Sequence, residues 1–472
     1  MSRLRPIVLV VPLAALLWLI VGRGLVNYDT LYALVWGRDL AHGTLPDYGI
    51  SLAPTPHPLA TLAGVVLAPL SSLGSNGLHG EAATTVAVVG AFVALALLGW
   101  VVFRLGEEWF GRGAGLLAAA IILTRRPVLD YGSRVYVDIP YLVLVLGAML
   151  VETRRRRAGA PVLLLLGVAG LIRPEAWLFS GAYVLWLWVG GERDWRLVAL
   201  AGAGPLLWLL ADLAVTGDPL HSLTGTRDTA ETLGRVTGLQ HVPTTVPRRI
   251  GEILREPVLF GAAGGGVFSL LWLRERARLG AVVGVLAILA FSVLATAGLP
   301  ILGRYLLLPA AILALFCAAG VLGWRLLEPE HPRRRLWMAW GAVTVVLLIV
   351  FTPAQVNRIT DLRKALRIQS HIQADLGGLV RAGAFSSRCR AVTVPNHRPV
   401  PLLALWLDRD PTLIGSAEAK LPQSGAYVVP ASQQVAKDYV LDPRDPVQAT
   451  PKAPPGFARA SSNASWIVYQ RC

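Results

Sequence analysis

The chain has 472 residues, of which 54% are hydrophobic and only 15% are charged. This composition is more apolar than that of soluble domains, so an ordinary soluble protein is excluded. The formal net charge of +15 does not indicate a nucleic-acid partner, because residues 1–352 contain no Lys and their Arg residues cluster between apolar runs.

Apolar runs of membrane-span length recur along the first part of the chain. The first covers residues 7–22, and we interpret it as a retained anchor because further spans follow and no cleavage site is convincing. Other clear runs cover residues 83–102, 197–215, 279–298, 301–323 and 336–351. Together with shorter runs such as 160–172, they predict an all-α polytopic membrane domain of about 11 transmembrane helices over residues 1–352.

One apolar segment, residues 59–70, is too short to cross a bilayer, since a span needs about 20 residues. If it did cross, every later Arg cluster would lie on the opposite side of the membrane. We therefore expect an interfacial or re-entrant helix that belongs to a large first outer loop, residues 23–82.

The Arg clusters predict the orientation of the chain. Arg-rich linkers occur at residues 104–112, 154–157, 193–196, 274–278 and 325–335. We expect the protein in the inner (cytoplasmic) membrane. Because Arg-rich linkers stay on the cytoplasmic side, the N-terminus is also expected in the cytoplasm. Residues 23–82, 125–137 and 216–256 then form the long outer loops.

The composition changes at residue 353, after which all four Lys residues occur. Residues 358–380 have helical spacing of Ile and Leu. Short β-prone runs follow at residues 390–395, 426–430 and 466–470, separated by Pro-rich turns. We predict a small α/β or α+β domain over residues 353–472, extracytoplasmic by parity.

The Cys residues agree with an outer location. Cys389 stands at the start of one predicted strand and Cys472 at the end of another, so a disulfide between them is expected in an oxidising compartment. Two free thiols are the alternative. Cys317 lies in the middle of a span and is interpreted as a small packing residue.

Asp29 is the strongest candidate for a functional residue. It follows directly after the first apolar run, so its carboxylate is expected at the membrane surface, where ionisable groups are costly and commonly functional.

Further polar clusters occur at other outer span ends: Arg134 with Asp138, Arg173 with Glu175, and Arg304 with Tyr305. Carboxylates and arginines from distant parts of the sequence are thus expected on one membrane face. Such an arrangement suits general-base chemistry beside an anionic leaving group.

Each of these residues also has a structural alternative. Asp138 precedes Ile-Pro and Glu175 follows a Pro, so each acid could simply start a helix. Arg173 and Arg304 could pair with those acids or lie in the headgroup layer. His57, within Pro-Thr-Pro-His-Pro, could be a rigid-turn residue only.

Soluble-enzyme motifs do not compete with this interpretation. The sequence has no Walker loop, no His-Glu-x-x-His and no Cys-x-x-Cys. The glycines at 264–266 lie within an apolar run and are expected to allow close helix packing.

Several of these motifs, in this order, resemble the GT-C superfamily of integral-membrane glycosyltransferases. The similarity is to bacterial members related to the aminoarabinose transferases and protein mannosyltransferases. Tyr28-Asp29-Thr30-Leu31-Tyr32 resembles their first-loop acidic motif, and residues 54–59 resemble the Pro-rich turn after it. Asp138-Ile139-Pro140 resembles the later acidic motif, and Arg304-Tyr305 resembles an Arg-Tyr near the outer end of a late span.

The resemblance covers roughly residues 1–325 and implies a hexosyl- or pentosyltransferase. Asp29 would be the catalytic base, and Asp138 would be a second catalytic carboxylate. The expected substrate-binding set is Tyr28, His57, Arg134, Arg173, Glu175, Arg304 and Tyr305. The Lys-poor, Ala- and Arg-rich composition favours a GC-rich bacterial source, for which mannose or arabinose donors are expectations.

The implied reaction uses a polyprenyl-phosphate-linked sugar on the outer membrane face. Asp29 would deprotonate an acceptor hydroxyl of a glycan, lipid or protein, which attacks the anomeric carbon with inversion. Arg173 or Arg304 would stabilise the departing lipid phosphate. Asp138 and Glu175 would orient the sugar or acceptor, or hold a divalent metal ion (Mg, Mn or Ca).

Two other functions remain open from the sequence. A multi-span transporter of a lipid-linked or small polar solute is one, although transporters place charged groups near the bilayer midplane and often show repeats. A non-catalytic assembly or glycan-binding protein that uses its C-terminal domain is the other.

Overall fold

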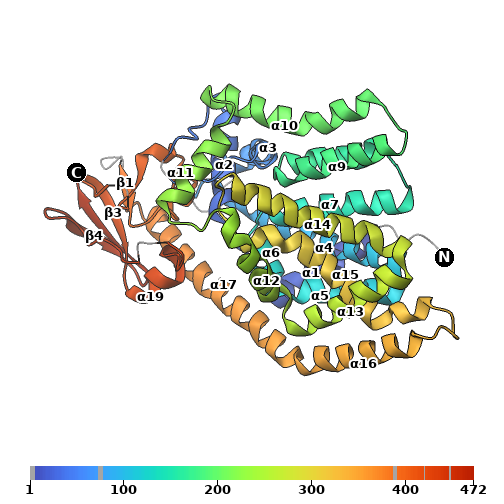
Figure 1. Cartoon of the computed structure of the whole chain (residues 1–472). Coiled ribbons are helices and arrows are strands. Elements are labelled where there is room, and N and C mark those ends of the chain that lie inside the picture. Colours follow the sequence, from blue (N-terminus) through green and yellow to red (C-terminus); the bar gives the residue numbers. More distant parts are fainter. Residues whose placement is uncertain (1–5, 51, 73–77, 386–390, 419, 446–447) are drawn as a thin grey trace. The chain divides into compact units, whose positions relative to one another are not determined.

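The computed structural model describes residues 6–50, 52–72, 78–385, 391–418, 420–445 and 448–472, and most of the chain is helical (Figure 1). The chain divides into two compact units. The helical unit comprises residues 1–21, 90–209 and 236–362, and the sheet unit comprises residues 22–89, 210–235 and 363–472. Three helices contain a boundary between units: α4 (Glu81–Phe110), α10 (Trp195–Thr216) and α17 (Thr352–Arg381).

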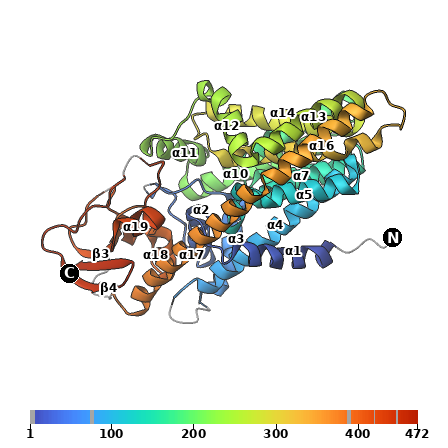
Figure 2. The same cartoon turned by 90° about the horizontal axis from the view of Figure 1, so that it is seen from below.

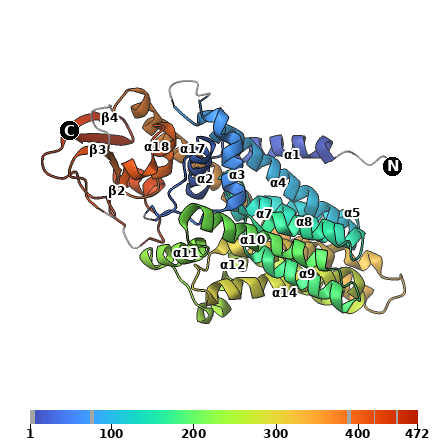
Figure 3. The same cartoon turned by 90° about the horizontal axis from the view of Figure 1, so that it is seen from above.

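The helical unit is a bundle of mainly apolar helices. Its further elements are α1 (Pro6–Val21), α5 (Arg112–Thr124), α6 (Arg126–Ser133), α7 (Asp138–Arg154), α8 (Ala160–Gly170), α9 (Glu175–Val189), η2 (Leu239–His241), α12 (Val242–Leu254), α13 (Glu256–Trp272), α14 (Arg274–Thr296), η3 (Gly303–Leu306), α15 (Leu307–Leu322), η4 (Gly323–Leu326) and α16 (Arg334–Val350). Helices α7, α8 and α9 pack side by side (Figure 3). Helices α13, α14 and α16 lie near one another in Figure 2, and each of them packs against α15.

The apolar helices indicate a membrane location. Among the described residues, four helices are long and apolar enough to cross a bilayer: α4, α10, α14 and the helix that runs from Gly303 to Leu326. Two bent helix pairs raise this number to as many as six. Several other apolar helices, including α5, α8 and α13, have only 10–17 residues. The predicted total of about 11 spans is therefore not confirmed.

Close packing of α13 against α15 explains the run of glycines in α13. A Cβ at Gly265 would overlap the carbonyl group of Phe316, and a Cβ at Gly320 would overlap the carbonyl group of Gly261. Because only a hydrogen fits at these positions, the two backbones approach closely, as the sequence predicts. The free thiol of Cys317 is buried beside Gly261, which confirms its packing role.

The sheet unit contains five strands in the order β2-β1-β3-β5-β4. These are β1 (Val392–Val394), β2 (Ile414–Ser416), β3 (Gly425–Pro430), β4 (Ala458–Ser462) and β5 (Trp466–Arg471). Strands β1, β2 and β3 are parallel, whereas β5 is antiparallel to both β3 and β4. Helix α18 (Val400–Trp406) connects β1 to β2, so the small domain is α/β with an antiparallel extension, and its predicted strands are confirmed.

The remaining elements of the sheet unit surround these strands. They are α2 (Tyr28–Ala41), α3 (Pro58–Leu67), η1 (Ala68–Ser72), α11 (His221–Thr232), η5 (Pro411–Leu413), α19 (Gln433–Val435) and the single π-helical turn η6 (Ala436–Val440). The predicted short helix at residues 59–70 is thus confirmed as α3 with η1.

Helix α2, which carries Asp29, belongs to the hydrophobic core of the sheet unit. Its side chains Leu31, Val35 and Trp36 are buried in one cluster with residues of α17, α18 and the strands. The residues of α2 that bury their apolar face here come from the predicted first outer loop. The compact unit that holds the C-terminal residues thus also includes residues 22–89 and 210–235.

Buried Arg38 fixes α2 to the end of α18. Its guanidinium donates to the carbonyl oxygens of Ala404 and Arg409, each at 3.2 Å, and to Asp408 at 3.1 Å. A cation at a helix C-terminus complements the partial negative charge of the last carbonyl groups. This contact fixes the helix that begins at Asn27 and Asp29 relative to the sheet.

Candidate active site

A sharp bend between two helices presents Asp138 in the helical unit. Helices α6 and α7 meet at an angle of 113°, and Val135 between them has φ of 58°. A β-branched residue in this left-handed region is unusual, and such strain is commonly found at functional sites. Asp138 is the first residue of α7, and its side chain is 2% exposed.

Arg173 links Asp138 to Glu175. It lies in the short turn between α8 and α9, while Glu175 is the first residue of α9 after Pro174. The Arg173 guanidinium forms ion pairs with both carboxylates, and its Nε atom is 3.1 Å from Oε1 of Glu175. All three side chains are buried, the structural alternative in which Arg173 pairs with these acids is confirmed, and each acid also starts a helix.

Each carboxylate of this group keeps one oxygen for a further partner. Oδ2 of Asp138 and Oε2 of Glu175 are buried and accept no hydrogen bond from any described residue. Buried polar atoms are nearly always hydrogen-bonded in proteins, and an exception calls for an explanation. Hydroxyl groups of a bound polyol would supply the donors that these two oxygens lack.

Tyr305 lies between two guanidinium groups. The Cζ atom of Arg173 is 3.9 Å from the ring centre of Tyr305, and that of Arg304 is 5.6 Å from it. Arg304 also stacks at 5.1 Å on Tyr136, and Arg173 at 5.7 Å on Tyr141. These cation–π contacts orient both arginines within the aromatic part of the site.

The structure thus brings together five of the predicted site residues: Asp138, Arg173, Glu175, Arg304 and Tyr305. Arg134 lies at the end of α6, where its Nε atom pairs with Asp130 at 2.5 Å. Two acids and two arginines give the cluster of five no formal net charge.

Asp29, Tyr28 and His57 lie in the sheet unit. Asp29 is half-buried in the first turn of α2, a position where the helix dipole favours a carboxylate. The N-cap itself is Asn27, whose side chain accepts a hydrogen bond from the Thr30 amide at 3.1 Å. The first-loop motif is therefore a helix start, a structural role that the sequence alone did not indicate.

Tyr28 stands beside Asp29 and holds the loop that follows α2. Its hydroxyl donates to the carbonyl oxygen of Leu52 at 2.8 Å. Burial raises the pKa of Tyr28 well above its ordinary value, and the nearby charges of Asp29 and Glu418 raise it further. Its phenol therefore stays neutral and acts as a hydrogen-bond donor near physiological pH.

His57 is the N-cap residue of α3, with Pro58 next to it, and its side chain makes no capping hydrogen bond. The loop before it contributes to a groove of about 350 Å³ in the sheet unit, which residues 48–50, residues 52–56 and helix α11 line. Polar side chains of α11, namely His221, Thr226 and Asp228, face this groove. Tyr48 stacks on His221 with 6.2 Å between ring centres.

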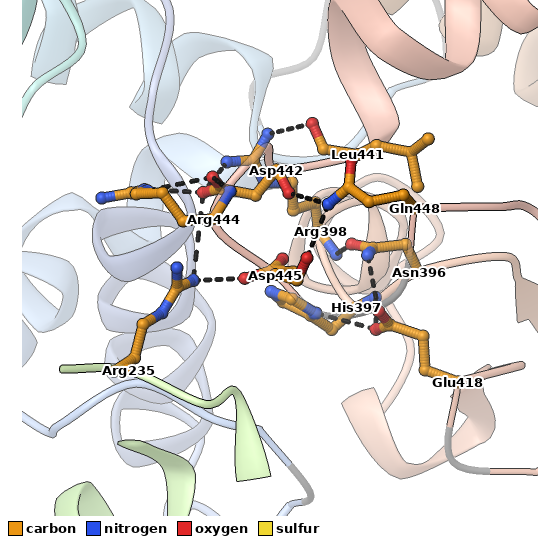
Figure 4. A network of polar contacts seen from close by, with 10 residues as sticks. All are labelled: Arg235, Asn396, His397, Arg398, Glu418, Leu441, Asp442, Arg444, Asp445 and Gln448. Atoms are coloured by element: carbon orange, nitrogen blue, oxygen red, sulfur yellow. Dashed lines mark hydrogen bonds and ion pairs between the residues drawn. The ribbon is translucent and has the colours of Figure 1, made fainter. Parts of the chain in front are cut away.

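A polar network in the sheet unit contains residues that the sequence did not single out (Figure 4). His397 follows β1, and its Nδ1 atom forms a hydrogen bond of 2.9 Å with Oε2 of Glu418. The centre of its ring lies 5.1 Å from the centre of the Tyr28 ring. Burial alone raises the pKa of Glu418, but the hydrogen bond and charge of His397 outweigh it and lower that pKa. The helix that carries Asp29 thus lies beside a His–Glu pair.

The other half of the network centres on Asp442. Its carboxylate accepts from Arg398 and Arg444, each at 2.6 Å, while Asp445 pairs with Arg235 from the segment after α11 (Figure 4). Burial acts to raise the pKa of Asp442, but the hydrogen bonds from Arg444 and the charge of Arg398 hold it far below its ordinary value. These ion pairs fasten residues 210–235 to the loop before β4.

Sequence analysis missed Tyr141, His397 and Glu418. Tyr141 occurs three residues after Asp138, a spacing that places both on one face of a helix and could have revealed it. No comparable signal exists for His397 and Glu418, because separate strand ends bring them together.

The two carboxylates around Arg173 are the predicted place for a divalent metal ion, and the Arg173 guanidinium contacts both. Within the described parts of the chain, no group of three or more His, Cys, Asp or Glu side chains could hold a metal. Cys472 forms a disulfide bond, as predicted, while its predicted partner Cys389 lies outside the described residues.

The sequence matches no family model, and a search of curated proteins finds no match either. The structure, in contrast, is similar to solved structures. It matches ArnT from Cupriavidus metallidurans bound to undecaprenyl phosphate with a TM-score of 0.56 and 13% identity, over 98% of this chain and 97% of that one. It also matches the arabinofuranosyltransferase AftD from Mycobacteria with a TM-score of 0.54 and 16% identity, over 100% of this chain and 40% of that one.

This likeness extends over nearly the whole chain, including the sheet unit, although the sequence resemblance covered only roughly residues 1–325. The likeness to these structures confirms the fold that the short motifs suggested: the chain has the fold of the GT-C glycosyltransferases.

Proposed function

We propose that this protein transfers a sugar from a polyprenyl-phosphate-linked donor to an acceptor hydroxyl at the outer face of the cytoplasmic membrane. The observation that carries the proposal is the pair of buried carboxylate oxygens beside Arg173, in a chain with the GT-C fold. Oδ2 of Asp138 and Oε2 of Glu175 lack donors, and sugar hydroxyls are donors of the right kind. Similarity to ArnT, solved with undecaprenyl phosphate, supports a lipid-phosphate carrier.

The proposed step is an inverting displacement. The Asp29 carboxylate takes the proton of the acceptor hydroxyl, and the acceptor oxygen forms a bond to the anomeric carbon. The bond between that carbon and the phosphate oxygen breaks, and its electron pair leaves with the polyprenyl phosphate. The products are the glycosylated acceptor, protonated Asp29 and the free carrier.

The geometry of the helical unit favours Arg304 over Arg173 as the cation for the leaving phosphate. Arg173 already shares its guanidinium between Asp138 and Glu175, whereas Arg304 stacks on Tyr136 and Tyr305. Charge-assisted bonds from a guanidinium to phosphate are strong, and aromatic rings fix the plane of the Arg304 guanidinium. We assign the Asp138–Arg173–Glu175 group to sugar binding.

The groove of the sheet unit supports a place for the acceptor. Residues 48–50, residues 52–56 and α11 line it, in the unit that contains Asp29, and its polar side chains include threonines, His221 and Asp228. Such side chains bond to hydroxyl-rich molecules. The acceptor class, whether glycan, lipid or protein, and the donor, for which mannose or arabinose are the expectations, belong to this proposal as well.

The test is sugar transfer by purified protein in liposomes, with a polyprenyl-phosphate-sugar panel as donor. Asp29→Asn should lower the rate about 10²- to 10⁴-fold, the range that a lost general base commonly produces. Asp47→Asn is the matched control, because Asp47 is an exposed acid of the same loop segment. Wild-type turnover by a folded Asp29→Asn variant would remove Asp29 as the base.

The transporter remains the alternative. Counterflow of a labelled solute in the same liposomes, with no covalent product from any donor, would favour transport over transfer. That result would leave the fold unchanged and reject the proposed reaction.

A further inference from the structure

A second cationic site occurs in the helical unit, away from the residues of the proposed reaction. It is a pocket of about 350 Å³ whose lining includes Arg126, Arg255 and Arg358. These arginines come from the start of α6, the junction of α12 with α13, and the first turns of α17. Three segments distant in sequence thus bring three guanidinium groups to one cavity.

The acids at this pocket are neutralised by other residues. Asp130 pairs with Arg134 at 2.5 Å, and Glu252 pairs with Arg248 and Arg249 at 3.1 and 2.6 Å. In the described part of the chain, neither Arg126 nor Arg358 forms an ion pair, although Arg255 and Arg126 both repel Arg358. The pocket therefore has an uncompensated positive charge.

Arg255 has only a weak partner. Its Nε atom is 3.5 Å from Oε2 of Glu256, a side chain that is 65% exposed, and this buried nitrogen has no hydrogen bond to any described residue. Among the described residues, the Nε atom of Arg255 thus has no hydrogen-bond acceptor.

Arg126 and Arg255 lie at helix N-termini, where an anion is favoured. Arg126 is the first residue of α6 and Arg255 is the N-cap residue of α13, although Arg255 is also the C-cap residue of α12, where a cation is favourable. Arg255 also has φ of 70° and ψ of 164°, a backbone region that is essentially restricted to glycine. A glycine would make this turn without strain, so the chain keeps the side chain for another reason.

We propose that this pocket binds the phosphate of an anionic phospholipid headgroup. Guanidinium groups bind phosphate oxygens through paired N–H donors, and two helix N-termini add favourable partial charge. The neighbouring helices α5 and α13 are apolar and would flank the acyl chains of such a lipid. A free phosphate ion shares the recognised chemistry and is the other source of the ligand.

The test uses the purified full-length protein with phosphatidylglycerol and phosphatidylcholine as probes. Native mass spectrometry after delipidation should show phosphatidylglycerol retained on the wild type in preference to phosphatidylcholine. The double variant Arg126→Gln/Arg358→Gln should lose this retention at least about tenfold, because charge-assisted bonds are removed. Arg274→Gln/Arg278→Gln, at the start of α14, is the matched control and should retain the lipid.

Inorganic phosphate provides the second arm of the test. If phosphate alone raises the melting temperature of the wild type but not of the Arg126→Gln/Arg358→Gln variant, the same pocket takes free phosphate. Equal retention of phosphatidylglycerol by wild type and this variant, at equal melting temperature in phosphatidylcholine, would overturn the proposal. The outcome is independent of sugar transfer, since no residue of the proposed reaction is changed.

Discussion

Replacement of Arg173 by Met tests the buried ion group most directly. The guanidinium is 5% exposed and is shared by Asp138 and Glu175, which are 2% and 8% exposed. The variant would leave two carboxylates buried together without a counter-ion. Removal of one partner of a buried ion pair costs about 3–5 kcal/mol, which corresponds to a fall in melting temperature of about 6–20 °C for a domain of this size.

The assay is thermal unfolding of purified protein in one detergent, followed by intrinsic tryptophan fluorescence. The triple variant Arg173→Met/Asp138→Asn/Glu175→Gln should recover most of the lost melting temperature, because it leaves no bare charge in the site. Arg248→Met serves as the control, since Arg248 is 73% exposed and its pair with Glu252 is worth at most about 1 kcal/mol.

A melting temperature of Arg173→Met within 2 °C of the wild type, an interval set at about the effect of 1 kcal/mol, would refute the reasoning. It would mean that water or a second cation already neutralises Asp138 and Glu175. Failure of the triple variant to recover would show instead that Arg173 acts by packing against Tyr305 rather than by charge.

Three further predictions concern other parts of the chain. The melting-temperature difference between wild type and Asp442→Asn should persist from neutral pH down to about 5 and shrink below about 4. The reason is that the pKa of Asp442 is lowered in the folded state, so its stabilisation is full above the pKa of the unfolded chain and is lost as the pH falls toward the folded pKa. An unchanged difference at pH 3 would contradict this. Gly265→Ala should destabilise the protein by overlap with Phe316, whereas Gly266→Ala, which has ordinary space, should not; equal melting temperatures would disprove the close packing of α13 on α15. Sugar transfer should survive chelation of divalent ions, since no group of three or more His, Cys, Asp or Glu side chains among the described residues could hold a metal; activity lost to EDTA and restored by Mg²⁺ would contradict this.

Local sequence signals predicted part of the candidate site correctly. Asp138 lies two residues before Pro140, and Arg173 and Glu175 flank Pro174, where apolar runs begin or end, and the turn chemistry of such positions is visible in sequence. The pairing of Arg173 with both acids was only one of the alternatives that the sequence left open. It depends on the 113° bend between α6 and α7, which rests on Val135 in a conformation that its own chemistry disfavours.

The role of α2 could not be predicted for a different reason. Residues 31–36 are almost continuously apolar or aromatic, so they show no one-sided helical period from which a buried face can be read. Their burial arises from contacts with α17, α18 and the strands, more than 300 residues later in the chain. The predicted number of spans is not confirmed, because several apolar runs form helices of only 10–17 residues.

The place of α2 in the sheet core affects how this chain can be recombined. Trp36 and Arg38 belong to the same folding core as α18, so a C-terminal segment exchanged alone with a relative would meet a foreign surface. The exchangeable part is instead discontinuous: residues 22–89, 210–235 and 363–472 have to move together. Evolutionary exchange of the C-terminal residues would therefore also require exchange of α2, the helix that carries the proposed base.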